Sequence, residues 1–328
     1  MKDQTSENYV AVHRDEFIPG TQTPVDIFLK LSEQNYVMIL KEGSKVHFEN
    51  LHFPEKAVWL YVRKTEYHKC VGQALTVAGI VLDSDKISEE KKTEFLSKAV
   101  DSTFKEIGQL GFDHQALEHA KLVSKSVQAL VGNKPDITAV ITMMQNLSDE
   151  LIRHSMMTSA IAVIIAKNMK WTLALNLEKL ALGALLHDVG MKELPEELLD
   201  LPRHAMTRDQ TAAYESHVFR GAEILRSMPS ISEDIISMVL EHHENAAGQG
   251  YPRRLRDIKT NPFARVVALA DSFVDLVVKS PNNPHPREAL SALAYIEVTL
   301  GQPFHKPAFI ALKQSLQGKD ALKIKKVV

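Results

Sequence analysis

Two patterns of hydrophobic and polar positions divide the chain. Over residues 1–72 short apolar runs alternate with polar ones, and "YVMILKEGSKVHF" holds two β-rich runs around Lys41–Ser44 that predict a hairpin. The run "AVWLYVRK" predicts a further strand, and "TPVDIFLKLS" predicts a short helix. We therefore expect a small N-terminal α/β domain over residues 1–72.

From about Val71 onward the apolar positions recur at helical spacing nearly throughout. Ser88 is a candidate cap for a long helix that places Phe95, Ala99 and Phe104 near one face, and "VGNKPDI" predicts a break between two helices. Residues 73–135 are then a helical linker or the start of the main domain, which follows over residues 136–320. The predicted fold class is mainly α.

Composition narrows the classes of function. Lys and Arg together number 39 against 41 for Asp and Glu, so no global basic signature points to nucleic acid as a partner. The one cysteine, Cys70, excludes an intrachain disulfide and argues against a cysteine-based zinc site. The N-terminus lacks the apolar core of a signal peptide, and the most apolar runs are too short to span a bilayer. We expect a soluble, cytoplasmic protein without membrane insertion.

Candidate metal ligands recur on the apolar faces or at the ends of five predicted helices. His243 follows Ile236 and Val239 at helical spacing, and so should face inward. The full set is His154, His187, Asp188, His217, His242, His243 and Asp271.

Each of these residues also has a simpler interpretation. A lone buried histidine is more often a hydrogen-bonded core residue, Asp188 could cap the following turn, and Asp271 could pair with Arg265. The recurrence favours one shared metal site, because several uncompensated polar burials would be costly. Imidazole and carboxylate ligands without thiolate suit Fe, Mn or Zn. Seven ligands suit two six-coordinate ions that share a bridging carboxylate, and such a pair can generate a hydroxide for phosphoester hydrolysis.

The ordered motifs "RHS", "LLHDVG", "SHVFRGAEIL", "EHHENAAGQGYP" and "ALADSF" resemble the HD-GYP family over about residues 140–315. The resemblance implies an HD-type all-α bundle that hydrolyses cyclic di-GMP to pGpG and GMP in bacterial second-messenger signalling. It implies two divalent ions, with Fe favoured and Mn or Zn possible. It also implies that all seven candidates are ligands, that Asp188 bridges the ions, and that His187 and Asp188 are catalytic.

The same resemblance extends to partners and to a third ion. It implies a regulatory or partner-binding role for the N-terminal domain, and a docking surface for diguanylate cyclase domains at the loop of Gly250, Tyr251 and Pro252. In three-metal members an acidic residue near Glu150 is a ligand. The alternative for Glu150 is a solvated residue near a helix start.

Several positions depart from the family pattern. Met191 stands where the family has lysine, with Lys192 one place later, and Ala247 replaces an aspartate. The second aspartate expected after Asp271 is shifted to Asp275, and Ser280-Pro281-Asn282 replaces Arg-Pro-Tyr. The metal ligands are thus retained, while residues that would hold the substrate phosphate are changed. Candidate replacement cations for substrate binding are Lys192, Arg253 and Arg254.

Three functions remain open on this basis. The first is a cyclic di-GMP phosphodiesterase. The second is a catalytically weak or inactive metal-containing cyclic di-GMP sensor or scaffold, which the changed phosphate-holding positions favour. The third is a phosphohydrolase that acts on another nucleotide. Turnover by the metal-loaded protein separates the first two, and a nucleotide panel separates the third.

Overall fold

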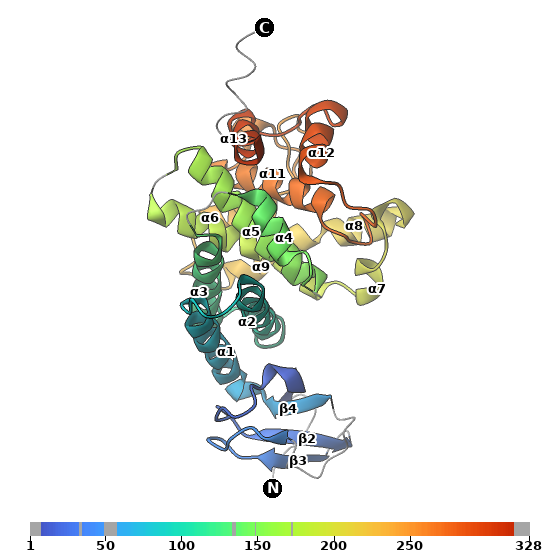
Figure 1. Cartoon of the computed structure of the whole chain (residues 1–328). Coiled ribbons are helices and arrows are strands. Elements are labelled where there is room, and N and C mark those ends of the chain that lie inside the picture. Colours follow the sequence, from blue (N-terminus) through green and yellow to red (C-terminus); the bar gives the residue numbers. More distant parts are fainter. Residues whose placement is uncertain are drawn as a thin grey trace.

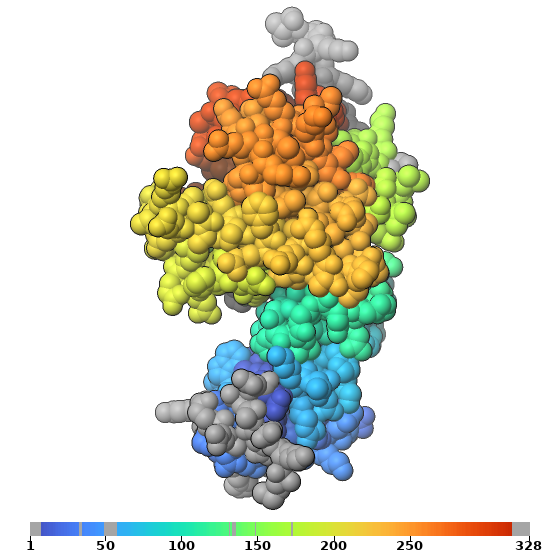
Figure 2. All heavy atoms as spheres, turned by 180° about the vertical axis from the view of Figure 1, so that it is seen from behind, coloured from blue at the N-terminus to red at the C-terminus, as the bar shows by residue number. Residues whose placement is uncertain are grey.

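The computed structural model describes residues 8–32, 35–48, 58–132, 136–147, 149–171 and 173–317. A small sheet lies at the N-terminal end, three long helices follow, and a larger helical body completes the chain (Figure 1). From behind, the teal segment of the long helices lies between the blue sheet and the broad yellow and orange face of the body (Figure 2). The mainly α fold with a small N-terminal α/β part is therefore confirmed.

The sheet is antiparallel and has the strand order β1-β4-β2-β3. Successive side chains of a strand point to opposite faces of the sheet, so alternate residues share one face. Val10 and Val12 of β1 and Leu60 and Val62 of β4 are all buried on such a face. The strand predicted in "AVWLYVRK" is confirmed as β4. The strands are β1 (Tyr9–His13), β2 (Ile27–Ser32), β3 (Asn35–Leu40) and β4 (Trp59–Arg63).

Two local predictions for this domain are wrong. The run "TPVDIFLKLS" contains strand β2 rather than a helix, because β3 and β4 supply ladder partners on both sides and an isolated helix of this length is unstable. The predicted hairpin around Lys41–Ser44 is also absent from the described strands. Strand β3 pairs with β2 instead, and Lys45 forms an isolated bridge with Gln22.

Three helices connect the sheet to the body, and they pack against one another. The Ser88 cap is confirmed, since its Oγ accepts a hydrogen bond from the Lys91 amide at 3.4 Å. Ala99 and Phe104 are buried, whereas Phe95 is half-buried. The helices are α1 (Tyr67–Leu82), α2 (Glu89–Leu110) and α3 (His114–Val131), and α3 also packs against α6 of the body.

The helical body surrounds α5, which is buried along nearly its whole length and packs against α6, α11 and α13. The predicted break at "VGNKPDI" is confirmed, because α3 ends at Val131 and α4 begins at Ile137. The helices are α4 (Ile137–Met144), α5 (Glu150–Asn168), α6 (Ala174–Leu186), α7 (Glu196–Leu199), α8 (Arg208–Glu215), α9 (His217–Arg226), α10 (Glu233–Glu241), α11 (Pro262–Val277), α12 (Ala289–Ala294) and α13 (Lys306–Gln317).

One hydrophobic core runs from the sheet to the body. It includes Val12 and Leu60 of the sheet, Leu96 of α2 and Ile161 of α5 in a single connected cluster. Among the described helices, none combines the length and apolar character needed to cross a bilayer. The predicted domain boundaries at 72/73 and 135/136 stay predictions. The predicted end at residue 320 lies outside the described residues.

We predict that this connected core makes the linker helices part of the stability of the whole chain. Leu96→Ala removes a fully buried side chain, and we expect a loss of about 2–5 kcal/mol in the free energy of unfolding. Leu122→Ala on α3 is the matched control, because Leu122 is 51% exposed. Urea titration followed by circular dichroism measures both, and equal losses would contradict the prediction.

Candidate metal centre

Three histidines at helix ends share one local geometry. Each ring Nδ1 lies within hydrogen-bond distance of the carbonyl oxygen three residues earlier, where a helix end leaves that carbonyl unpaired. A carbonyl can only accept, so Nδ1 carries the proton and Nε2 presents its lone pair. The pairs are His187 with Ala184 at 2.7 Å, His217 with Tyr214 at 2.7 Å, and His242 with Val239 at 2.8 Å.

These lone pairs point at one another. The Nε2 atoms of His217 and His242 are 3.4 Å apart, and neither can donate to the other while both Nδ1 protons bond to carbonyls. All three rings are fully buried. A positive charge between the nitrogens stabilises this arrangement, and either a bound metal ion or protonation of an imidazole supplies it.

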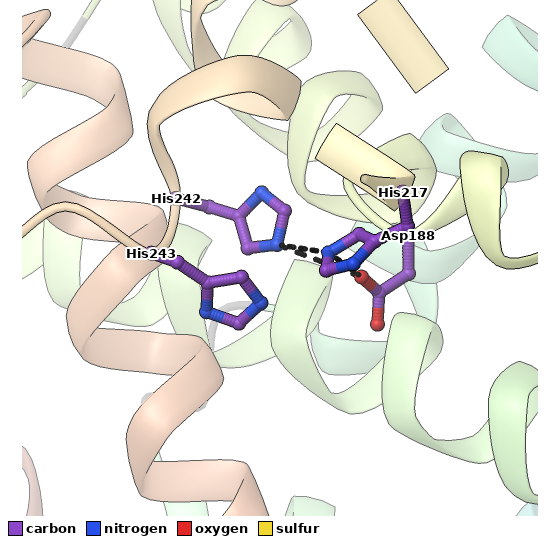
Figure 3. A group of neighbouring side chains, drawn as sticks. All are labelled: Asp188, His217, His242 and His243. Carbon is purple, nitrogen blue, oxygen red and sulfur yellow. Dashed lines mark hydrogen bonds and ion pairs between the residues drawn. The ribbon is translucent and has the colours of Figure 1, made fainter. Parts of the chain in front are cut away.

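Asp188 faces His217 and His242 on one side (Figure 3) and His187 and His154 on the other. Its Oδ1 is 3.3 Å from His217 Nε2 and 3.5 Å from His242 Nε2. Its Oδ2 is 3.4 Å from His187 Nε2 and 3.9 Å from His154 Nε2. Oδ1 is buried yet forms no hydrogen bond among the described residues. One carboxylate therefore faces both groups, which is the position of a bridging ligand.

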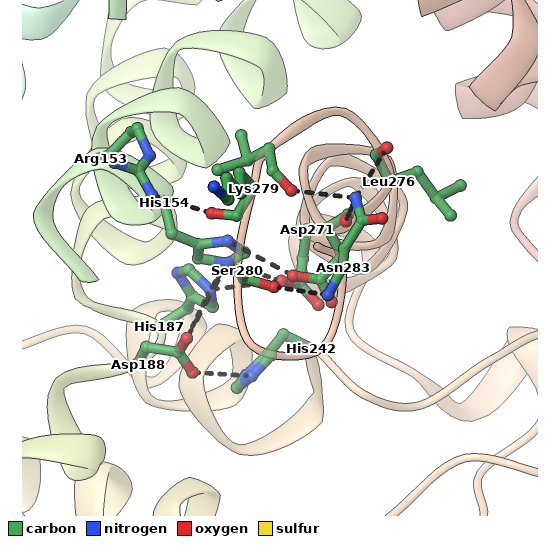
Figure 4. Close-up of polar contacts among 12 residues, drawn as sticks. Arg153, His154, His187, Asp188, His242, Asp271, Leu276, Lys279, Ser280 and Asn283 are labelled. Carbon is green, nitrogen blue, oxygen red and sulfur yellow. Dashed lines mark hydrogen bonds and ion pairs between the residues drawn. The ribbon is translucent and has the colours of Figure 1, made fainter. Parts of the chain in front are cut away.

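Asp271 of α11 closes the other side of the cluster (Figure 4). Its Oδ1 is 2.9 Å from His154 Nε2, and its Oδ2 is 3.4 Å from His243 Nδ1. All seven residues selected from the sequence therefore converge from α5, α6, α9, α11 and the segment after α10. Two groups with metal-ligand spacing share Asp188: His217, His242 and His243 with Asp188, and His154 and His187 with Asp188.

Asp275 joins the cluster as well, and the sequence analysis treated it only as a displaced residue. Its Oδ1 is 3.5 Å from His154 Nδ1, and it forms a third group with His154 and Asp271. It follows Asp271 by four residues, so the two carboxylates share one face of α11. That spacing is the signal that could have identified it.

The electrostatics of the cluster favour bound positive charge. Burial would raise the pKa of Asp188, but the adjacent His187, whose own pKa is raised, holds it well below its usual range. Burial lowers the pKa of His217 to about 4, against the charge of Asp188, so this imidazole is neutral. Burial would also lower the pKa of His154, yet its hydrogen bond with Asp271 and the nearby carboxylates raise it to about 10. Ionised carboxylates and a neutral imidazole are ready to ligate a cation.

The simpler interpretations of single residues do not describe this cluster. Asp188 makes no side-chain cap bond to the 3₁₀ helix Val189–Glu193 that follows it. Arg265 lies 3.6 Å from Asp257 and donates to the Thr260 carbonyl, so Asp271 has His154 as its close partner instead. The donor set and its geometry fit divalent metal ions.

The loop after His243 packs over the cluster. Glu244 accepts hydrogen bonds from the amides of Arg253 at 2.7 Å and Leu255 at 2.8 Å, which fixes the course of the loop. Gly250 is required there, because a Cβ would lie 2.1 Å from the His243 carbonyl oxygen. Tyr251 then lies with its ring centroid 4.5 Å from that of His243.

A cavity of about 660 Å³ opens beside the cluster and is large enough for a nucleotide. His154, Asp188 and Asp271 form part of its wall. Of the substrate-binding candidates, Lys192 lines the cavity. Arg253 forms an ion pair with Glu241, and Arg254 has a positive φ of 55° in the loop.

Other cavity residues bear on the departures from the family. Met191 is buried, packs with Leu194 and Leu198, and lines the cavity. Glu150 also lines the cavity, and burial raises its pKa. The sequence analysis missed Arg203 and Tyr214, which line the same cavity. Nothing in the sequence pattern marked Arg203, whereas Tyr214 stands three residues before His217 and supplies its carbonyl partner.

Comparison with known proteins now identifies the class. A model of the HD domain family matches residues 138–301, half of the chain, so the chain belongs to the HD domain family. The HD-GYP resemblance drawn from the sequence motifs agrees with this family. A solved HDG"Y"P protein from Bdellovibrio bacteriovorus superposes with a TM-score of 0.65 over 95% of this chain and 100% of that chain, at 17% identity, and shares the fold.

Three relatives carry names that describe an activity. A cyclic di-GMP phosphodiesterase of Thermotoga maritima is 29% identical over 185 residues, 55% of this chain and 50% of that protein. Another from Pseudomonas aeruginosa is 25% identical over 155 residues, 47% and 37% of the two chains. The 3'3'-cGAMP-specific phosphodiesterase 2 of Vibrio cholerae is 35% identical over 95 residues, 29% and 18%. The chain spans half or less of the length of these relatives.

We predict that Asp188→Asn lowers both the metal content and the stability that metal provides. The substitution keeps the shape and removes the charge that faces both histidine groups. Chelation of wild-type protein should lower its melting temperature by about 5 °C or more, and the variant should show little change. His204→Gln is the control, because His204 lines the cavity but belongs to none of the described ligand groups. Elemental analysis and thermal melts give the two readouts, and unchanged metal content in Asp188→Asn would overturn the assignment.

Proposed function

We propose that this chain is a metal-dependent phosphodiesterase that hydrolyses cyclic di-GMP to pGpG and GMP. The observation that carries the proposal is Asp188, whose two oxygens face separate histidine groups beside a nucleotide-sized cavity. The names of the relatives from Thermotoga maritima and Pseudomonas aeruginosa support the substrate. We place the activity in the cytoplasm, where a bacterial second messenger of this kind is made and degraded.

The proposed cofactor is a pair of divalent ions, with iron favoured and manganese or zinc as alternatives. Imidazole and carboxylate ligands suit these metals. His217, His242 and His243 would hold one ion, His154, His187 and Asp271 the other, and Asp188 both. Ions bound there would activate a water at neutral pH and neutralise charge on the phosphate.

The chain itself positions these groups and selects the substrate. The carbonyl partners of His187, His217 and His242 keep their tautomers and ring orientations fixed, which preorganises the ligands. Asp188 and His187 would be catalytic as ligands that hold the ions where these activate water. Lys192 brings a positive charge to the cavity wall, where a phosphodiester would lie.

A second candidate is a related phosphodiesterase with another cyclic dinucleotide as its substrate. The Vibrio cholerae relative named as specific for 3'3'-cGAMP favours it. A third candidate, a metal-containing sensor or scaffold with weak or no activity, is favoured by Met191. Its apolar side chain lies at the cavity wall where the family pattern has a lysine.

The loop of Gly250, Tyr251 and Pro252 is proposed to contact a diguanylate cyclase domain, with the N-terminal domain in a regulatory role. Just beyond this loop the side chain of Ile258 is 84% exposed. Ile258 therefore offers a solvent-exposed position at which the proposed contact can be tested. Its substitution by serine should weaken such an interaction without changing metal content.

We predict metal-dependent turnover of cyclic di-GMP. Protein loaded with Fe²⁺ or Mn²⁺ without oxygen should produce pGpG and GMP, followed by chromatography. The double variant His187→Ala/Asp188→Ala should lose about 100-fold or more in rate, because two ligands are removed. Arg208→Gln should retain activity, because Arg208 is exposed and outside the described cavity lining. Protein with two bound ions per chain and no turnover would contradict the phosphodiesterase proposal and favour the sensor.

We predict that cyclic di-GMP is preferred over 3'3'-cGAMP and over mononucleotides. The comparison is of kcat/KM on the same metal-loaded preparation, since that ratio measures discrimination between substrates. A higher value for 3'3'-cGAMP would replace the first candidate by the second.

A further inference from the structure

The cavity beside the metal centre is strongly acidic. Its described lining carries seven carboxylates, and two side chains with a permanent positive charge, Lys192 and Arg203. Metal ions would compensate the carboxylates of the cluster itself. Asp149, Glu150, Glu196 and Asp200 would still repel a second anionic group of the substrate. A dianionic ligand therefore needs a cation away from the metal ligands.

Two tyrosine rings lie between Arg203 and the metal-ligand histidines. Its guanidinium carbon is 5.1 Å from the ring centroid of Tyr214 and 5.4 Å from that of Tyr251. The Tyr214 ring is 5.6 Å from His217, and the Tyr251 ring is 4.5 Å from His243. The two tyrosines fix the plane of the guanidinium by cation–π contact, and they separate it from the ligand histidines.

The guanidinium retains donors for a ligand. One of its five N–H groups binds Glu215 Oε1 at 2.9 Å, and Glu215 is the one side-chain acceptor recorded for it in the described part of the chain. The Arg203 side chain is 39% exposed and lines the cavity, which Glu215 does not. The ion pair thus orients the planar group and leaves other N–H donors toward the cavity.

The backbone of Arg203 is anchored to the loop after α11. Its amide donates to Asn282 Oδ1 at 2.6 Å. That loop is itself fixed, because Arg153 Nη2 donates to the Lys279 carbonyl at 2.9 Å and Asn283 Nδ2 donates to carbonyls at the end of α11 (Figure 4). The Ser280-Pro281-Asn282 segment, which replaces Arg-Pro-Tyr, therefore positions an arginine from another part of the chain.

We propose that Arg203 binds the phosphate of a cyclic dinucleotide that is not being cleaved. The scissile phosphate must lie against the metal ligands, and the tyrosine rings keep Arg203 from that position. A cyclic dinucleotide carries a second phosphodiester, and a planar guanidinium can bind it with two parallel hydrogen bonds. This inference rests on the proposed function, whose substrate class supplies the second phosphate.

The test compares two substrates with Arg203→Gln, Arg203→Lys and a control, Arg208→Gln. Arg208 begins α8 and is exposed outside the described cavity lining. Cyclic di-GMP has two phosphodiesters, and bis(4-nitrophenyl) phosphate has one. We expect Arg203→Gln to raise KM for cyclic di-GMP about 10- to 100-fold while kcat/KM for bis(4-nitrophenyl) phosphate and metal content stay unchanged. Arg203→Lys should be intermediate, because it keeps the charge and loses the planar fork.

A binding measurement removes the dependence on turnover. In a His187→Ala background, which leaves the contacts of Tyr214 and Tyr251 in place, calorimetry should show at least about tenfold weaker cyclic di-GMP binding when Arg203→Gln is added. Unchanged cyclic di-GMP kinetics and binding would overturn the inference. Equal losses on both substrates would also overturn it, since Arg203 would then support the whole site.

Failure of the proposed function has a different signature. It would appear in the wild-type protein, as cleavage of bis(4-nitrophenyl) phosphate without binding or cleavage of cyclic di-GMP or 3'3'-cGAMP. The inference would then fall with it. If the wild-type protein binds 3'3'-cGAMP alone, the same variants are measured with that ligand, and unchanged binding in Arg203→Gln would overturn the inference.

Discussion

The site depends on three hydrogen bonds from imidazole Nδ1 to a carbonyl three residues earlier. Each uses a carbonyl near a helix end, where the helix supplies no amide partner. The hydrogen bond therefore satisfies the carbonyl and fixes the orientation of the histidine ring. The bonds also decide the tautomer, and thereby turn the Nε2 lone pairs inward. Once the Nε2 atoms of His187, His217 and His242 face a buried space, bound positive charge stabilises them there, as a divalent ion would supply.

Close backbone approach brings the helix ends together. At Gly190, two residues after Asp188, a Cβ would lie 2.1 Å from the His217 carbonyl oxygen and 2.5 Å from the Gly221 amide. The turn that carries the bridging carboxylate can therefore approach α9 only without a side chain at this position. The same steric constraint applies at Gly250, where the loop passes close to the His243 backbone. Ligand spacing is thus set by the backbone packing of these turns and by the side chains themselves.

Sequence reasoning selected the seven clustered residues because polar groups stand out in apolar helices. His243 and Asp271 were placed inward by periodicity alone, and the structure brings them together. Asp275 lies one helical turn after Asp271 on the same face, yet the family pattern indicated it only as a displaced residue. The prediction of a helix for the run that contains β2 is wrong although β3 follows it directly, because the apolar spacing of "TPVDIFLKLS" does not by itself show pairing with β3 and β4. Arg203 could not be found at all: an exposed arginine after a proline looks like surface, and its anchor Asn282 is 79 residues further along.

The continuity of the core has a thermodynamic consequence. Helix α6 ends at the His187–Asp188 pair and packs against α3, which packs in turn against α1 at the edge of the sheet. Elements that unfold together share a single folding equilibrium. A ligand that binds only the native form adds RT ln(1 + [L]/Kd) to the free energy of unfolding of all these elements. Metal availability would therefore set the lifetime of the distant β-sheet against proteolysis. Conversely, a partner that binds the folded sheet would raise the fraction of chains in which the distant metal site is formed.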